Sequence, residues 1–168
     1  MAAAIEPLVV LLGQLEEQLA VVDKSLRERA EGDPVVRRLC GVVGIGPVTA
    51  AAYVAAIDDP HRFCEAGEVA SYVGLVPRER SSGEQQRRGR ITKAGNSRVR
   101  SLLVEAGWTV LRGRHPAMER LRAWAERIAA RRSKQVAAVA LARRLARILY
   151  AMWRDGVDYN PAVLARGA

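Results

Sequence analysis

The sequence has few of the residues that build disulfide, metal or histidine-based sites. Its 168 residues include two cysteines, Cys40 and Cys64, and two histidines. Two cysteines are too few for a small secreted disulfide scaffold, and neither lies in a C-x-x-C or Cys/His ligand spacing. His61 precedes Cys64 by three positions, but two candidate ligands do not make a zinc site. The composition therefore predicts a protein of a reducing cytosol with no metal site of its own.

The sequence also lacks the patterns of membrane spans, secretion signals and strands. The apolar N-terminal stretch 1–13 has no basic n-region and continues into a polar helical pattern, so we expect neither a signal peptide nor a span. No period-two alternation of apolar and polar residues is present at any length. We therefore expect an all-α domain that does not associate with membranes.

Acidic residues are outnumbered by basic ones, and this imbalance indicates the class of partner. The chain has 27 Lys and Arg against 18 Asp and Glu, a formal charge of +9, while 49% apolar residues are enough for a core. Arg greatly exceeds Lys, and the guanidinium group binds phosphates bidentately. Nucleic acid is the partner that this composition favours.

The basic charge is concentrated in 74–100, a stretch that has only Glu79 and Glu84 as acidic residues. It also contains Pro77 and several glycines, which interrupt regular structure. We therefore expect a long basic loop that faces a polyanion. Its basic residues, which we predict to contact DNA, are Arg78, Arg80, Arg87, Arg88, Arg90, Lys93, Arg98 and Arg100.

Two serines near the centre of this stretch, Ser81 and Ser82, are followed by Gly83. A serine hydroxyl among guanidinium groups can attack a phosphodiester that those groups hold. The alternative is a solvated surface loop, because Ser-Ser-Gly is common in linkers and no histidine lies nearby in sequence to act as a base. The residues alone leave both interpretations open.

Residues 1–33 predict a long helix with an apolar seam. Gly32, Asp33 and Pro34 end it, and charged residues flank the seam. This pattern predicts a coiled coil and a homo-oligomer, and the alternative is an amphipathic helix packed on its own domain. The seam repeats at spacings of three and four through Ile5, Leu8, Leu12, Leu15, Leu19, Val22 and Leu26. We expect a helical domain over 34–160 and a tail over 161–168.

Residues 39–57 resemble a helix-hairpin-helix. Gly44, Ile45 and Gly46 allow a tight turn, and Pro47 suits the first turn of the following helix. The N–H groups and dipole at such a helix start favour an anion, so the three turn residues are predicted to seat one DNA phosphate. The alternative is a helix–helix corner in which glycine permits close packing.

Further helices are predicted from capping residues. Asn96, His115 with Pro116, and Ser133 each precede a helical apolar pattern. His115 therefore indicates a helix start more than a catalytic base. Asp58 and Asp59 lie before a proline at a helix end, which is more typical of a cap or turn than of a metal site.

Three stretches in order carry a resemblance to a known family: GVVGIGPVTAAAYVAAIDDPHRF, YVGLVPRERSSGEQQRRGRITKAGNSRVRSLLVEAGW and VALARRLARILYAMWRDG. Over about 35–159 the chain resembles the C-terminal domain of insertion-sequence transposases of the IS110, IS116 and IS902 type. The resemblance implies a DNA recombinase of the DEDD serine type, whose serine forms a covalent link to DNA. The Ser-x-Gly pattern of the family selects Ser81 as the nucleophile, with Ser82 in reserve.

The same resemblance implies partners that these residues do not test. Such transposases carry an N-terminal RuvC-like domain whose acidic residues bind Mg²⁺, and an element-encoded structured RNA guides them to DNA. This sequence starts at the predicted coiled coil, so we expect Mg²⁺ only with the RuvC-like domain and no autonomous activity. A cytoplasmic, nucleoid-associated bacterial protein is implied. A non-catalytic DNA- or RNA-binding module, or a transposase remnant, is the alternative function.

Overall fold

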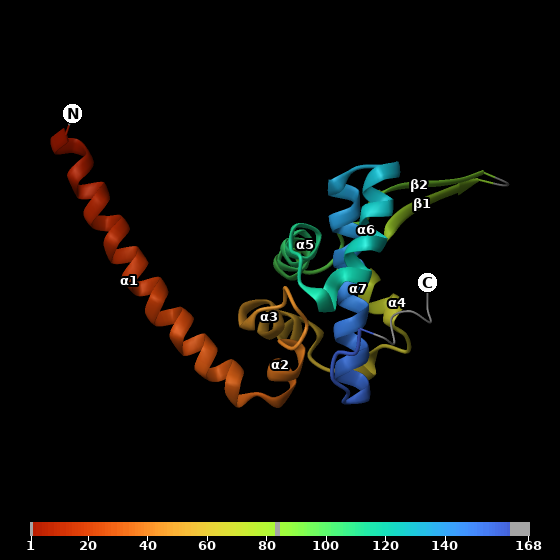
Figure 1. Cartoon of the computed structure of the whole chain (residues 1–168), viewed down its shortest axis with the longest axis horizontal. Helices are drawn as coiled ribbons and strands as arrows, with labels where there is room; N and C mark the ends of the chain where they lie inside the picture. Colours follow the sequence, from red (N-terminus) through yellow and green to blue (C-terminus); the bar gives the residue numbers. More distant parts are fainter. Residues whose placement is uncertain (1, 83–84, 162–168) are drawn as a thin grey trace.

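The computed structural model describes residues 2–82 and 85–161, and it describes their side chains except at 2–4, 79–82 and 85–88. Within these ranges the chain forms α-helices, two short 3-10 helices and one hairpin of two strands (Figure 1). The all-α class is confirmed. The elements are α1 Ala2–Gly32, α2 Pro34–Leu39, α3 Pro47–Ile57, η1 Pro60–Arg62, α4 Ala66–Tyr72, β1 Pro77–Ser82, β2 Gln85–Ile91, α5 Ser97–Arg112, η2 Pro116–Met118, α6 Glu119–Arg131 and α7 Lys134–Asp155.

The core forms around α7, against which α4, α5 and α6 all pack. Leu141, Leu145 and Leu149 of α7 are fully buried, and each such leucine contributes about 1.5–3 kcal/mol through loss of water contact. The α5 and α7 backbones approach closely at Gly107, where an added Cβ would lie 2.5 Å from the carbonyl oxygen of Ala138. Small residues at this crossing therefore set the distance between the two longest helices of the domain.

The helix pair α2 and α3 is attached to this core through a buried tyrosine. The Tyr53 ring is fully buried, and its hydroxyl donates a 2.8 Å hydrogen bond to the carbonyl oxygen of Ala146 on α7. Burial raises the pKa of the Tyr53 phenol well above its usual range. The phenol must therefore stay protonated for α3 to remain packed against α7.

This burial predicts a loss of stability in alkali. Because the pKa of Tyr53 is raised in the folded state, its contribution is fully present below the unfolded pKa of about 10 and is lost as pH rises above it. Tyr53→Phe is expected to cost about 1 kcal/mol at neutral pH and to flatten the fall in stability above pH ~10. Urea unfolding at several pH values checks this, with Tyr72→Phe as the exposed control; equal slopes in all three proteins would contradict it.

The helix starts predicted at Asn96, His115 and Ser133 are confirmed by side-chain capping bonds. The Asn96 side chain accepts hydrogen bonds from the N–H groups of Arg98 and Val99 at the start of α5. Ser133 caps α7, and the Nδ1 atom of His115 accepts from Ala117 N–H at η2. His115 is thus a helix-start residue.

Helix α1 extends away from the rest of the chain (Figure 1). Its main contacts with other described elements are with α2 and α3. Six of the seven seam residues, from Ile5 to Val22, are 52–61% exposed, and Leu26 is half-buried. The alternative in which this helix packs its apolar face on its own domain is therefore not what the structure adopts. Its apolar side chains face solvent in the single chain.

The prediction of a long basic loop over 74–100 is wrong for its central part. Residues 77–82 and 85–91 form an antiparallel hairpin that projects from the helical domain (Figure 1). No strand pattern is visible in these residues, because period-two alternation arises when one face of a sheet is buried and this hairpin has polar residues at nearly every position. Charged residues at its edges also disfavour pairing with other chains.

Candidate nucleic-acid interface

The two serines lie on β1 close to the hairpin end. The backbone register pairs Ser81 with Gln86, Ser82 with Gln85 and Arg80 with Arg87. Side chains at these positions, including Arg80, Arg87 and Arg88, lie outside the described part, as do Gly83 and Glu84 altogether. Neighbouring positions along a strand alternate between the two faces of the hairpin. Ser81 and Ser82 therefore occupy register positions on opposite faces.

Two glycines at the base of the hairpin, Gly74 and Gly95, allow backbone segments to pack against each other closely. An added Cβ at Gly74 would lie 2.1 Å from the carbonyl oxygen of Ala94, and one at Gly95 would lie 1.8 Å from that of Tyr72. Both glycines have a φ of +72°, a backbone conformation that residues with a side chain rarely adopt. The segments before β1 and after β2 therefore interlock, and only glycine fits at either position.

Two predicted DNA contacts hold this base together through their guanidinium groups. Nη1 of Arg100 donates to the carbonyl oxygens of Val73 at 3.2 Å and Ala94 at 3.0 Å, which joins both legs of the hairpin to α5. Nη2 of Arg78 donates to the carbonyl oxygen of Thr92 at 3.2 Å. Arg100 is half-buried and Arg78 exposed, so Arg78 retains more of its surface for another contact.

The remaining described basic residues of this stretch are exposed around the hairpin base. Arg90 lies on β2, Lys93 follows the strand, and Arg98 lies in the first turn of α5. Lys93 has a φ of +57°, and its N–H donates to the carbonyl oxygen of Gly74.

The strand register shifts between Pro77 and Glu79, where β2 has one more residue than β1. A bulge of this kind increases strand twist at the point where the hairpin leaves the domain.

The predicted phosphate turn at 44–46 packs more tightly than a projecting loop. Gly44 lies against α5, and an added Cβ there would be 3.4 Å from the carbonyl oxygen of Ala106. The Ile45 side chain is buried and its N–H donates to the carbonyl oxygen of Val42. Gly46 is the exposed N-cap of α3 and supplies no side-chain cap, and Pro47 occupies the first turn as predicted. Gly46 and the start of α3 are thus the part of the turn that solvent reaches.

The described ranges contain neither a cluster of metal ligands nor a helix that could span a membrane. No three or more His, Cys, Asp or Glu side chains of residues 2–82 and 85–161 gather into a possible metal site. Asp58 ends α3, and the Asp59 carboxylate accepts from the N–H of His61. None of the described helices combines the length and apolar character needed to cross a membrane.

The sequence of this chain matches one protein family over the part that forms the hairpin and α5. The model of the Transposase IS116/IS110/IS902 family matches residues 36–122, slightly more than half of the chain. The chain belongs to this transposase family. The matched part includes the turn before α3, the interlocked hairpin and all of α5, so the resemblance noted from the sequence motifs is confirmed.

Relatives of the family extend the similarity over most of the chain. A "Probable family 20 transposase" of Pseudomonas aeruginosa is 36% identical over 150 residues, which cover 89% of this chain and 44% of the relative. The transposase for insertion sequence element IS1111A of Coxiella burnetii is 30% identical and covers 84% and 37%, respectively. That for IS1328 of Yersinia enterocolitica is 28% identical and covers 88% and 44%. The chain thus spans less than half the length of these relatives.

Sequence reasoning did not predict that two of the family motifs pack against each other at the hairpin base. Gly-Leu-Val-Pro at 74–77 and Lys-Ala-Gly-Asn at 93–96 each contain one of the interlocked glycines, and Asn96 also caps α5. The only feature of the sequence that indicated this contact was a glycine near each end of the basic stretch. Their pairing across 21 positions is a tertiary contact, which glycine spacing does not reveal.

Proposed function

We propose that this chain contributes DNA binding and a serine nucleophile to DNA transposition, with Ser81 as the attacking residue. Membership of the transposase family carries this proposal. The hairpin supports it, because its interlocked base anchors Ser81 and Ser82 on a projecting element, and Arg90, Lys93 and Arg98 are exposed near that base. A rigidly anchored element can bring a hydroxyl to a DNA backbone that the compact domain does not reach.

In the proposed step, the Ser81 oxygen forms a bond to the phosphorus of a phosphodiester. One bond from phosphorus to a deoxyribose oxygen breaks, and the serine proton passes through solvent to the leaving oxygen. The product is a phosphoserine diester that keeps the energy of the broken link for rejoining. Nearby guanidinium groups would offset the charge that builds on the phosphoryl oxygens.

The Mg²⁺ implied by the family is part of the same proposal but belongs to the RuvC-like domain of a longer protein. The described residues provide no group of ligands that fits it. A structured RNA partner likewise remains a prediction for the whole transposase. Copurification of the longer protein with RNA from its own element tests it, and a nuclease-insensitive, RNA-free complex that still selects its DNA target would contradict it.

The DNA-binding part of the proposal predicts steep salt dependence. Each neutralised phosphate adds about 0.9 to the slope of log affinity against log salt, because counterions are released. Replacing both Arg87 and Arg88 by alanine is expected to weaken binding to all sequences and to lower the slope by about two. Fluorescence anisotropy at several salt concentrations measures this.

The matched control for this prediction is Lys24→Ala, which removes an exposed cation from α1, away from the hairpin. It should leave both affinity and slope nearly unchanged. If the wild-type chain bound DNA equally weakly at low and moderate salt, or if the Lys24 variant lost as much as the hairpin variant, the basic hairpin would not be the DNA contact.

We further propose that α1 pairs with α1 of a second copy through its exposed seam. Burying leucines that are more than half exposed in the single chain gives a driving force of about 25 cal/mol per Å² of apolar area. Light scattering at micromolar concentration should report a dimer or larger species, and Leu12→Glu with Leu15→Glu should return a monomer. Val21→Glu, exposed but off the seam, is the control; a wild-type monomer would contradict the pairing.

A further inference from the structure

Residues 157–160, here called the C-terminal strap, fold back along α7. Gly156 ends α7 in the left-handed conformation, and the Val157 N–H donates to the carbonyl oxygen of Met152. The Tyr159 hydroxyl donates to the carbonyl oxygen of Ala117 at 3.4 Å and contacts Met118 Sδ. These contacts tie the strap to the C-terminal end of α7 and to η2, which precedes α6.

A cavity of about 630 Å³ lies between the strap and α7. One wall is apolar and includes Ile148, Ala151 and Met152 of α7. Arg144 and Arg147 contribute the cationic part of the lining, and the strap adds polar groups from Asp158 and Asn160. The volume falls within the range of about 300–1,000 Å³ that is usual for small-molecule sites.

The two guanidinium groups make this cavity electropositive. Arg144 and Arg147 are three residues apart on α7 and both line the cavity, so their positive charges repel each other. Burial, and after it the charge of Arg147, lowers the pKa of the Arg144 guanidinium. Arg144 is also placed 4.8 Å over the Trp124 ring. A bound anion would relieve the repulsion between the two arginines.

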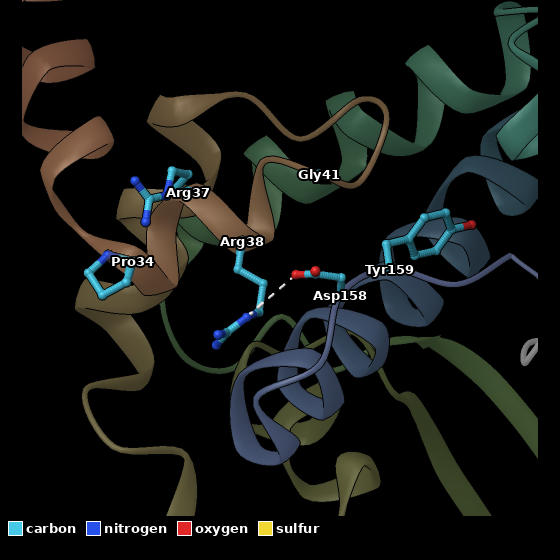
Figure 2. A pocket seen from close by; sticks show the side chains of 6 residues that line it. All are labelled: Pro34, Arg37, Arg38, Gly41, Asp158 and Tyr159. Carbon is cyan, nitrogen blue, oxygen red and sulfur yellow. Dashed lines mark ion pairs between the residues drawn. The ribbon is translucent and has the colours of Figure 1, made fainter.

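The acidic residue of the strap is partly neutralised from outside the cavity. Figure 2 shows Arg38 of α2 directed toward Asp158, while Arg37 points away from it. The Arg38 Nε lies 3.6 Å from the Asp158 Oδ1. Asp158 is mostly exposed, so this pair is weak, but it lowers the repulsion that an anion near the strap would meet.

We propose that this cavity binds one nucleotide unit, with the base against the apolar wall and the phosphate on Arg144 and Arg147. An apolar base and an anionic phosphate match the apolar and cationic residues of the lining. The proposal that the nucleotide comes from bound nucleic acid rests on the proposed function. Such a nucleotide must be single-stranded or extruded, because a stacked base pair does not present its base to a cavity.

The test is an NMR titration of the intact chain labelled with carbon-13 at its methionine methyl groups. Met152 lines the cavity, and Met118, which contacts Tyr159 but is not itself in the lining, is expected to shift less. Deoxyadenosine monophosphate is expected to shift the Met152 methyl signal through the ring current of the base. Deoxyribose phosphate, which has no base, should bind more weakly and produce no ring-current shift. Inorganic phosphate alone, binding as tightly as the nucleotide, would reduce the cavity to a simple anion site and overturn the proposal.

Arg147→Ala removes one phosphate contact from an exposed position and should weaken nucleotide binding about tenfold, the equivalent of about 1.4 kcal/mol for a charge-assisted contact. Arg120→Ala, an exposed cation on α6, is the matched control and should bind as wild type. Ala151→Leu fills the apolar wall and should weaken the nucleotide more than inorganic phosphate. Equal losses for Arg147→Ala and Arg120→Ala would overturn the assignment of the phosphate.

Single-stranded DNA and RNA, each with or without one abasic position, distinguish the sources of the nucleotide. A Met152 shift with the intact strand that decreases with the abasic one supports binding of a nucleic-acid base. If DNA binds with the expected salt dependence but neither it, RNA nor the mononucleotide shifts Met152, the cavity proposal fails and the proposed function stands. If the mononucleotide shifts Met152 but neither the single strands nor duplex DNA binds, the proposed function and the nucleic-acid source both fail, and the cavity is a site for free nucleotides.

Discussion

Ser81→Ala is expected to abolish the covalent protein–DNA adduct in a protein that joins this chain to a RuvC-like domain. The substitution removes only the oxygen that forms the new bond to phosphorus, and loss of a nucleophile lowers the rate on the order of 10⁴-fold or more. Salt-dependent DNA binding should persist, because no charge is lost. A denaturing gel with labelled DNA measures the adduct, and anisotropy measures the binding.

Ser82→Ala is the matched control for this experiment. The two serines are neighbours on β1 and occupy opposite faces in the strand register, so one hydroxyl does not readily replace the other. We expect only a modest decrease in the adduct with Ser82→Ala. An adduct that survives Ser81→Ala and disappears with Ser82→Ala would assign the reaction to Ser82. An adduct that survives both changes would remove the hairpin from the chemistry and favour a binding role alone.

Gly95→Ala is expected to destabilise the fold by roughly 3 kcal/mol or more, the sum of a strained left-handed residue and an overpacked contact. The new Cβ would lie 1.8 Å from the carbonyl oxygen of Tyr72, and backbone on both sides must move to accommodate it. Thermal and urea unfolding followed by circular dichroism measure this. Gly74→Ala, at 2.1 Å from the Ala94 oxygen, should behave similarly.

Gly156→Ala separates strain from contact in this prediction. Gly156 has a φ of +66°, close to that of Gly95, but an added Cβ would meet no atom within 4 Å. It should therefore cost only about 1 kcal/mol, the conformational part of the penalty. If Gly95→Ala destabilised the chain no more than Gly156→Ala, the interlock at the hairpin base would be wrong.

Much of the helical architecture could be predicted from local sequence. Asn96 and Ser133 indicate the starts of α5 and α7, because an N-cap side chain binds N–H groups only two or three residues away. Pro47 marks the start of α3 for the same local reason, since its ring fixes φ and it needs no hydrogen-bond donor there. The helical apolar pattern after Ser133 predicted α7, and Leu141, Leu145 and Leu149 of this helix are fully buried.

The candidate site could be predicted only in part. The basic stretch and the Ser-x-Gly pattern identified the residues to consider, and the family motifs identified the transposase group. The hairpin was missed because it buries no apolar face, so pairing leaves no alternation in the sequence. The structural use of Arg100 was missed because its acceptors, the carbonyl oxygens of Val73 and Ala94, belong to segments brought together by folding.

By itself, the sequence determined the helical class, several helix starts, the excess of basic charge and the family, because each depends on composition, on short motifs or on neighbours within a few positions. Tertiary structure decided that Gly74 and Gly95 interlock, that a basic hairpin projects from the domain and that the strap encloses a cationic cavity against α7. These features depend on contacts between residues far apart in the chain. Such contacts are set by which surfaces the core brings together, and no local pattern encodes them.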